Sequence, residues 1–228
     1  MRPWLALTYA GAVFTTATVD LQLDKQDLVR PDNTASDEAS ARALRERRAR
    51  GSVAGLFPVL YVGETPIHES LAICEWANEA YPAARLWPAA ALDRARARAL
   101  ASEMATGFMQ LRTHMSCHLF GRVRDYEPNP ATRRDIARVF EIWSQALDRS
   151  GGPFLFGRFG IADAMYFPVR TRLRTYGITI PESLAPYAHA LDELPATRAL
   201  EQAARTAPAI PAYDDYLKSL GGDPTAAL

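Results

Sequence analysis

The chain has 228 residues, 48% of them hydrophobic, so it can bury a substantial core and is not a disordered chain. Lys plus Arg number 26 and Asp plus Glu number 26, and this balance excludes a global field that would favour nucleic acid or an anionic membrane. The two cysteines form no CxxC pair and no disulfide framework, which indicates a reducing compartment and predicts a cytosolic protein.

The first residues, MRPWLALTYAG, show a helical pattern from Pro3 to Gly11, with a proline in the first turn and a glycine stop. A secretory signal is the alternative, but Thr8 and Tyr9 interrupt its apolar run, so a helix is the simpler interpretation. No later segment approaches the roughly 18 apolar residues that a membrane span requires.

Three further segments precede residue 52. FTTATVDLQL, residues 14–23, alternates and is rich in Thr and Val, which predicts a strand. Residues 24–40 contain the Pro, Asn, Asp and Ser typical of a loop. ARALRERRAR, residues 41–50, predicts a basic helix that ends at Gly51. Such a run of arginines is usually a solvated helix face.

The stretch FPVLYVGETPIHESLAICEW, residues 57–76, predicts two short strands around a glycine turn, followed directly by a helix from Ser70. Glu69 and Ser70 stand where the helix begins. A helix N-terminus presents unpaired N–H groups and a partial positive charge, so we expect Ser70 to cap the helix while the Glu69 carboxylate stays free. Such a corner is suited to a small zwitterion.

Beyond the proline-containing linker YPAARLWPAA, every predicted element is helical. Residues 91–115 predict one long helix, and a second contains a stripe of apolar residues at helical spacing. The third follows GRFG, with a bend expected at Pro168, and the fourth is interrupted near Pro195. The stripe of the second helix consists of Ile136, Val139, Phe140, Trp143 and Leu147.

FPVL with its central proline, HESLAICEW, GRFGIADAM and LWPAAALDRARARALASEM together resemble the glutathione S-transferase family over nearly the whole chain, nearest to bacterial members of the zeta class, which includes maleylacetoacetate isomerases. The resemblance implies a fold of the α/β plus all-α class. A thioredoxin-like glutathione-binding domain is expected at residues 1–81, followed by an all-helical substrate-pocket domain, a helical bundle, at residues 90–228. It also implies a homodimer formed through the helices at 70–81 and 91–115.

The same resemblance implies a glutathione site. The Phe57–Pro58 bond is expected to be cis, with the backbone N–H and C=O of Phe57 pairing with the cysteinyl part of glutathione like an added strand. Glu69 would accept from the γ-glutamyl ammonium, and Ser70 would bind its carboxylate at the helix N-terminus. Taken alone, the proline could simply end a strand and the serine simply cap a helix.

The residue that activates the thiol is not identified. In the family a Ser, Tyr or Cys at the end of the first strand supplies this hydrogen bond, and MRPW resembles the residues just after that position. The first strand is apparently lacking as well, although it lies in the middle of the family's sheet. We therefore expect the natural gene to start upstream; a rearranged sheet, or a strand borrowed from a partner chain, is the alternative.

Three other motifs are weaker candidates. THMSCH, with His114, Cys117 and His118, offers at most three metal ligands, so a zinc site is not preferred and no metal is expected. These residues either line the hydrophobic-substrate side near Phe108, Met109 and Arg112 or form a packed helix end, and the packed end is preferred. One arginine of residues 41–50 would border the glycyl end of glutathione by resemblance, but none can be singled out. GRFGIADAM is structural: Gly160 replaces the family's usual Ser or Thr cap, and Asp163 can still reach back to the Gly160 N–H.

The predicted function is that of a glutathione S-transferase, which adds the thiolate of its cosubstrate glutathione to a small hydrophobic electrophile or isomerises one. The alternative is a noncatalytic member of the family, serving as a glutathione- or ligand-binding module or a scaffold. Neither hypothesis involves nucleic acid or a membrane.

Overall fold

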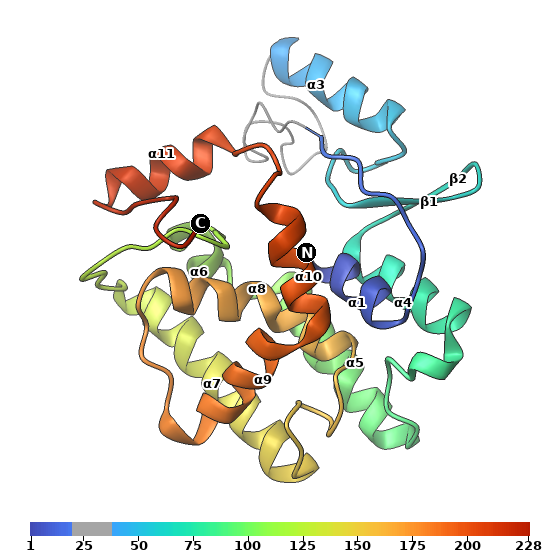
Figure 1. The fold of residues 1–228 in the computed structure, drawn as a ribbon, viewed down its shortest axis with the longest axis vertical. Helices are drawn as coiled ribbons and strands as arrows, with labels where there is room; N and C mark the ends of the chain where they lie inside the picture. The colour runs from blue at the N-terminus through green and yellow to red at the C-terminus, as the bar shows by residue number, and fades with distance from the viewer. Residues whose placement is uncertain (20–37) are drawn as a thin grey trace.

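The computed structural model describes residues 1–19 and 38–228 (Figure 1). Its first part contains a helix, a second helix, a hairpin and a third helix. These are α1 (Arg2–Tyr9), α3 (Glu38–Ala49), β1 (Val59–Val62), β2 (Thr65–His68) and α4 (Ser70–Ala80).

The rest of the chain is helical, as the sequence predicts. Its elements are the short 3-10 helix η1 (Pro82–Ala84), α5 (Ala91–Thr106), α6 (Met109–His114), α7 (Pro130–Ser150), α8 (Ile161–Thr175), the 3-10 helix η2 (Glu182–Leu184), α9 (Ala185–Glu193), α10 (Pro195–Ala204) and α11 (Pro211–Ser219). Within the described ranges, no helix is both long enough and apolar enough to cross a membrane.

The helices predicted near the start of the chain are confirmed. Each is followed by a glycine with positive φ, 76° at Gly11 and 83° at Gly51, a conformation that costs glycine little. The predicted hairpin is also present: β1 and β2 are antiparallel, with Val59 opposite His68 and Gly63 in the turn.

The strand predicted at 14–23 is wrong for residues 14–19, which have no assigned secondary structure. A strand requires a neighbouring backbone with which to form its ladder, and in the described residues the hairpin is a two-stranded sheet of its own. Residues 20–23, and most of the loop predicted at 24–40, lie outside the described residues, and helix α3 already begins at Glu38.

The single helix predicted at 91–115 is instead two helices. Phe108, with φ 60° and ψ 39°, lies between them in the left-handed region, which ends regular helical geometry. Gly107 precedes it, where an added Cβ would lie 2.8 Å from the Glu103 carbonyl oxygen. The sequence shows an unbroken apolar pattern, and this local backbone reversal is not visible in it.

The remaining helices lie where the sequence predicts them, and the bend expected at Pro168 stays a prediction. Of the predicted stripe on α7, Ile136, Val139 and Trp143 are buried, while Phe140 and Leu147 are half-buried and pack against the core. Helix α8 contains Pro168 in its interior, and α9 ends before Pro195, with which α10 begins. Both α9 and α10 are therefore separate helices, as expected from that proline.

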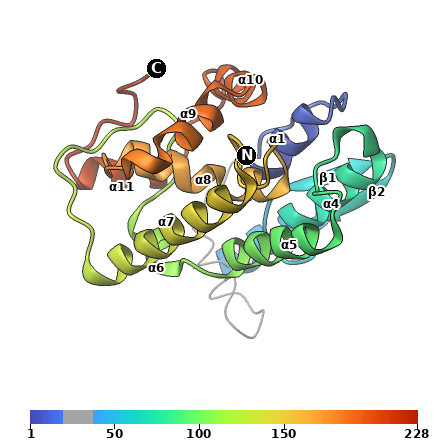
Figure 2. The same ribbon diagram turned by 90° about the horizontal axis from the view of Figure 1, so that it is seen from below.

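Helix α8 is the centre of the helical part, where Figures 1 and 2 show it surrounded by other helices. Its side chains are almost all buried from Ile161 to Val169. Helix α1 packs against α8, α4 and α10, and contributes Leu5 and Ala6, both 0% exposed, to the core. The first ten residues thus connect the hairpin side of the molecule with the helical part.

Candidate functional site

The corner between β2 and α4 differs in one respect from the sequence prediction. Glu69, not Ser70, is the N-cap of α4: its Oε2 accepts hydrogen bonds from the N–H groups of Leu71 at 2.8 Å and Ala72 at 3.3 Å. Ser70 is the first helical residue, and its hydroxyl donates to Glu69 Oε1 at 3.2 Å. The prediction of a serine cap beside a free carboxylate is therefore wrong, because the cap position precedes the first helical residue and its side chain faces the free amides.

Glu69 also has an unusual backbone. Its φ of 76° and ψ of 134° are uncommon for a residue with a Cβ, and glycine would adopt them at less cost. Strain of this kind persists only where the surrounding structure imposes it, and it is concentrated at functional sites. The side chain is exposed, so the strain places a carboxylate, a hydroxyl and the N-terminus of α4 together at the surface.

The other predicted site residues lie just before β1. The Phe57–Pro58 peptide bond is cis, as expected. Among the described residues, no partner is recorded for the backbone N–H or carbonyl oxygen of Phe57. A hydrogen-bonding backbone edge with one donor and one acceptor is therefore present beside the hairpin.

Three arginines from three helices lie close enough for their charges to act on one another, a grouping that the sequence prediction did not make. We call them the arginine cluster: Arg2 of α1, Arg112 of α6 and Arg172 of α8. The Nε atom of Arg2 donates to the Met165 carbonyl at 3.1 Å, and that of Arg172 donates to the Met115 carbonyl at 2.6 Å. Arg112 donates to the Ala105 carbonyl at 3.0 Å. Each guanidinium is thus held by a neutral backbone group.

The electrostatics of the arginine cluster favour an anion. Burial, together with the charges of Arg112 and Arg172, lowers the pKa of Arg2 to about 10. Burial, followed by the charge of Arg172, lowers the pKa of Arg112 as well. No ion pair joins any of the three to a carboxylate of the described residues. Half-buried cations without a counter-charge are costly unless an anion binds, and arginine is well suited to carboxylate.

The arginine cluster and the corner are neighbours. The Glu69 carboxylate acts on Arg2, where it partly offsets the lowering of the pKa. It also contributes, after burial, to raising the pKa of Cys74 to about 12. Cys74 is therefore a buried neutral thiol and not a nucleophile.

The motif THMSCH lies beside the arginine cluster but does not assemble a metal site. The Cys117 thiol is 3.8 Å from the Pro168 carbonyl oxygen, to which Arg172 also donates. His118 lies 3.7 Å from Asp214, on the side of α11. No group of three or more His, Cys, Asp or Glu in the part of the chain that the structure describes is placed to hold a metal ion.

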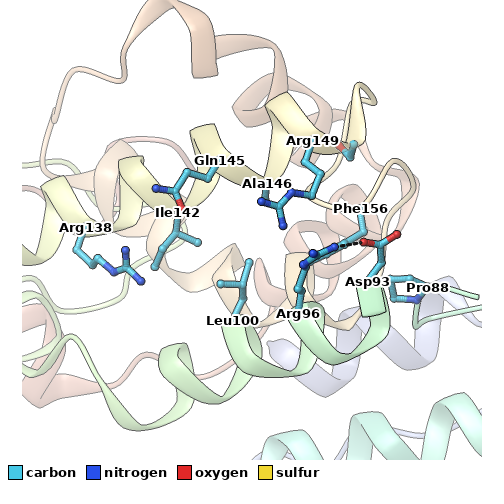
Figure 3. A pocket seen from close by; sticks show the side chains of 11 residues that line it. Pro88, Asp93, Arg96, Leu100, Arg138, Ile142, Gln145, Ala146, Arg149 and Phe156 are labelled. Atoms are coloured by element: carbon cyan, nitrogen blue, oxygen red, sulfur yellow. Dashed lines mark hydrogen bonds and ion pairs between the residues drawn. The ribbon is translucent and has the colours of Figure 1, made fainter. Parts of the chain in front are cut away.

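A groove of about 310 Å³ lies elsewhere, between α5 and α7 (Figure 3). Its floor is apolar, and Arg96, Arg138 and Arg149 point toward it from the two helices. Arg96 pairs with Asp93 at 3.0 Å, and Arg138 is held by Glu103 and Glu141. These ion pairs neutralise the charges of Arg96 and Arg138. The groove therefore favours an anionic ligand less than the arginine cluster does.

The motif GRFGIADAM has the structural position that the sequence predicts. Asp163 is 1% exposed, and its carboxylate accepts from the Gly160 N–H at 2.9 Å and the Leu155 N–H at 3.1 Å. Gly160 is required for a reason that the sequence does not show: an added Cβ would lie 2.5 Å from the Leu86 carbonyl oxygen. This close approach connects the start of α8 to the linker.

Comparisons with known proteins agree with this architecture. Residues 89–200 match the family model for the C-terminal domain of glutathione S-transferase. The probable maleylacetoacetate isomerase of Vibrio cholerae is 31% identical over 119 residues, which are 50% of this chain and 54% of that protein. The chain therefore matches about half the length of this curated relative.

Solved structures extend the likeness to nearly the whole chain. A bacterial zeta-class maleyl pyruvate isomerase has a TM-score of 0.64 at 22% identity, covering 91% of this chain and 94% of its own. A glutathione transferase homologue from Burkholderia, solved with bound glutathione, has a TM-score of 0.63 at 22% identity, covering 90% and 91%.

The molecule therefore has the fold of a glutathione S-transferase, and the predicted fold class is confirmed. Residues 89–200, just under half of the chain, match the C-terminal domain of the glutathione S-transferase family, in agreement with the sequence resemblance. The domain boundaries at 81 and 90, and the four glutathione-site residues, remain predictions.

Proposed function

We propose that the protein is a glutathione-dependent transferase or isomerase that binds glutathione through Phe57, Pro58, Glu69 and Ser70. The observation that carries this proposal is the strained backbone of Glu69, which holds an exposed carboxylate beside Ser70 at the N-terminus of α4. A cap residue of ordinary conformation would stabilise the helix equally well. The strain therefore supports a role in binding.

The corner fits the γ-glutamyl end of glutathione. Its ammonium group pairs with the Glu69 carboxylate, while its carboxylate accepts from the Ser70 hydroxyl and from the amides of Leu71 and Ala72, which now donate to Glu69. The backbone N–H and C=O of Phe57 pair with the cysteinyl residue as an added strand would. The two contacts fix both ends of the dipeptide part of glutathione.

The arginine cluster indicates which chemical group the electrophilic acceptor carries. A purely hydrophobic electrophile would leave three half-buried guanidinium groups with neutral backbone partners only and no ion pair, which is unfavourable. An electrophile that carries a carboxylate would instead supply the missing negative charge. We therefore propose a carboxylate-bearing unsaturated acid as the acceptor, with apolar residues such as Met115 and Phe108 of the same region around it.

The chemistry of glutathione suits this site. Its thiol has an ordinary pKa near 8.5, and lowering that value by two units requires about 2.7 kcal/mol of preferential stabilisation of the thiolate. Neighbouring cations provide stabilisation of this kind. The thiolate adds to one carbon of the double bond, the resulting single bond rotates, and elimination restores the double bond and the thiolate. The Vibrio relative and the zeta-class structure are both isomerases, which supports this sequence of steps.

A binding experiment tests the corner. Glu69→Gln keeps the shape and removes the charge, and we expect titration calorimetry to show glutathione binding weakened by at least about tenfold. Glu64→Gln, which alters an exposed carboxylate in the hairpin turn, is the matched control and should bind as the unaltered protein does. Undiminished binding by Glu69→Gln would remove the assignment of the corner.

A second experiment tests the acceptor. Arg112→Met should lower kcat/KM for an unsaturated carboxylic acid by about tenfold to a hundredfold, and leave that for its methyl ester unchanged, because only the acid uses the charge. Arg134→Met alters an exposed arginine on α7 and serves as the control. Equal losses for acid and ester would contradict a carboxylate site.

The quaternary structure and location are part of the proposal. We propose a cytosolic homodimer in which α4 and α5 make the contact, as the family resemblance implies. Equilibrium sedimentation should give twice the chain mass of 25.2 kDa at micromolar concentration. A measured mass equal to that of one chain would contradict the dimer, and it would leave the proposed glutathione site unaffected.

A further inference from the structure

We infer that Arg47 is a positioning residue for glutathione: it fixes the loop of residues 51–57, and through it the backbone of Phe57. This inference rests on the proposed function and adds a residue to the same site. Arg47 lies in the last turn of α3 and is 7% exposed, whereas the four other arginines of residues 41–50 are exposed. A buried arginine in an otherwise solvated basic helix requires a structural or functional reason.

Arg47 makes three contacts with this loop. One terminal guanidinium nitrogen, Nη1, donates to the Gly55 carbonyl at 3.2 Å, and the guanidinium carbon lies 5.9 Å from the centre of the Phe57 ring. Its own carbonyl oxygen accepts from the Ser52 N–H at 3.3 Å. Arg47 therefore contacts the loop at its second residue, at Gly55 and at its last residue.

The loop is closed on itself around these contacts. Ser52 is 0% exposed, and its hydroxyl donates to the Leu56 carbonyl, while the Gly55 N–H donates to the Ser52 carbonyl at 2.9 Å. Gly55, with φ 71°, packs on Leu44 of α3 so closely that an added Cβ would lie 2.3 Å from Leu44 Cδ1. Leu44 and Arg47 are three residues apart, so one face of α3 holds the loop.

This arrangement leaves one backbone edge available. Within the described residues, the loop carbonyls of Ser52, Gly55 and Leu56 accept hydrogen bonds, but the N–H and C=O of Phe57 have no recorded partner. A ligand that pairs with this edge binds more tightly when the loop is already ordered, because binding then does not have to supply the free energy of ordering the loop. Arginine is suited to the task, since its planar guanidinium can donate to a carbonyl and stack on a ring at once, which lysine cannot.

This positioning role of Arg47 differs from a direct contact between Arg47 and glutathione. The sequence left open which arginine borders the glycyl end of glutathione, and Arg47 is the one with almost no exposed surface. We therefore expect its effect to reach the cysteinyl part through Phe57, and not to depend on the glycyl carboxylate. This expectation separates the two roles experimentally.

The test compares Arg47→Met, Arg47→Lys and the control Arg45→Met, which alters an exposed arginine paired with Glu38. Calorimetry is performed on the full chain with glutathione and with γ-glutamylcysteine, which lacks the glycyl residue. We expect Arg47→Met to weaken both ligands by about tenfold, Arg47→Lys to recover only part of the loss, and Arg45→Met to change neither. The KM for the acceptor should stay within about twofold, since the arginine cluster is untouched.

A second readout needs no ligand. Hydrogen exchange of the Ser52 and Gly55 amides should accelerate at least about tenfold in Arg47→Met, while the amides of α8 keep their protection. A loss confined to glutathione, with γ-glutamylcysteine unaffected, would show a direct glycyl contact and overturn the inference. Unchanged affinity and exchange in Arg47→Met would overturn it as well. If the unaltered protein binds neither ligand, the proposed function itself fails, and the exchange result then reports on the loop alone.

Discussion

At the scale of single residues, the sequence predicts which side chains meet at the corner but not what each one does there. Glu69 and Ser70 lie together as expected, yet the carboxylate caps α4 and the hydroxyl binds the carboxylate. The two residues exchange their expected roles because the cap is the residue before the first helical residue, so it is Glu69 and not Ser70. The positive φ of Glu69 also has no signal in the sequence. The arginine cluster was missed for another reason: its members are far apart in the chain, and only the packing of three helices brings them together.

Asp163 leads to a prediction about pH. Burial raises its pKa to about 7, whereas an aspartate in an unfolded chain titrates near 3.9. Between roughly pH 4 and pH 7 the folded chain keeps a proton that the unfolded chain has lost, so the contribution of this group to stability falls as pH rises through that window. Below the window both states are protonated and the penalty is absent; above it the penalty is complete.

The expected result is a difference between two unfolding curves. Urea unfolding of the unaltered protein and of Asp163→Asn should show the free energy of unfolding of the unaltered protein falling, relative to that of the variant, between about pH 4.5 and pH 7.5. Asparagine does not titrate, so it provides the baseline. Parallel pH profiles for the two proteins would mean that Asp163 is ionised in the folded chain throughout.

At the scale of elements, helical periodicity predicts where the helices lie, and glycine and proline predict most of their ends. Two errors have physical causes. Residues 14–19 have a composition typical of a strand, but β structure depends on a partner backbone that this pattern cannot supply. The break between α5 and α6 depends on the left-handed Phe108, a residue type that gives no signal for it.

The start of α8 offers a test at this scale. By capping rules alone, Gly160→Ser should stabilise the protein by a few tenths of a kcal/mol. Because the new Cβ would lie 2.5 Å from the Leu86 carbonyl oxygen, we expect a net destabilisation of about 1 to 3 kcal/mol, and a similar loss for Gly160→Ala. Thermal unfolding of the three proteins decides between the two arguments, since a higher midpoint for the serine variant would favour capping.

At the scale of the whole molecule, α1 determines how the parts cooperate. It belongs to the hairpin side in sequence, but its buried face packs on α8 and α10 of the helical part as well as on α4. The family resemblance predicts the two-part architecture. The sequence does not indicate, however, that the first helix packs against helices of both parts. Its apolar pattern indicates only that one face is buried.

Shortening one side chain of α1 should therefore affect the entire chain. Leu5→Ala removes a side chain that is 0% exposed and should cost about 2 to 5 kcal/mol. Helical circular dichroism and tryptophan fluorescence should both report the same lowered urea midpoint. Val13→Ala, at a position 98% exposed, is the control and should change stability by less than about 0.5 kcal/mol. Two separate transitions in Leu5→Ala would contradict this cooperativity.

The arginine cluster has a consequence for handling the protein. Its three guanidinium groups come from residues 2, 112 and 172, so the site exists only when α1, α6 and α8 are all in place. An anion that binds there recognises the folded chain alone, and it therefore shifts the folding equilibrium by mass action. The choice of buffer anion becomes a variable of stability: carboxylate and phosphate buffers should protect this protein more than chloride does at equal ionic strength, and Arg112→Met should lose that preference.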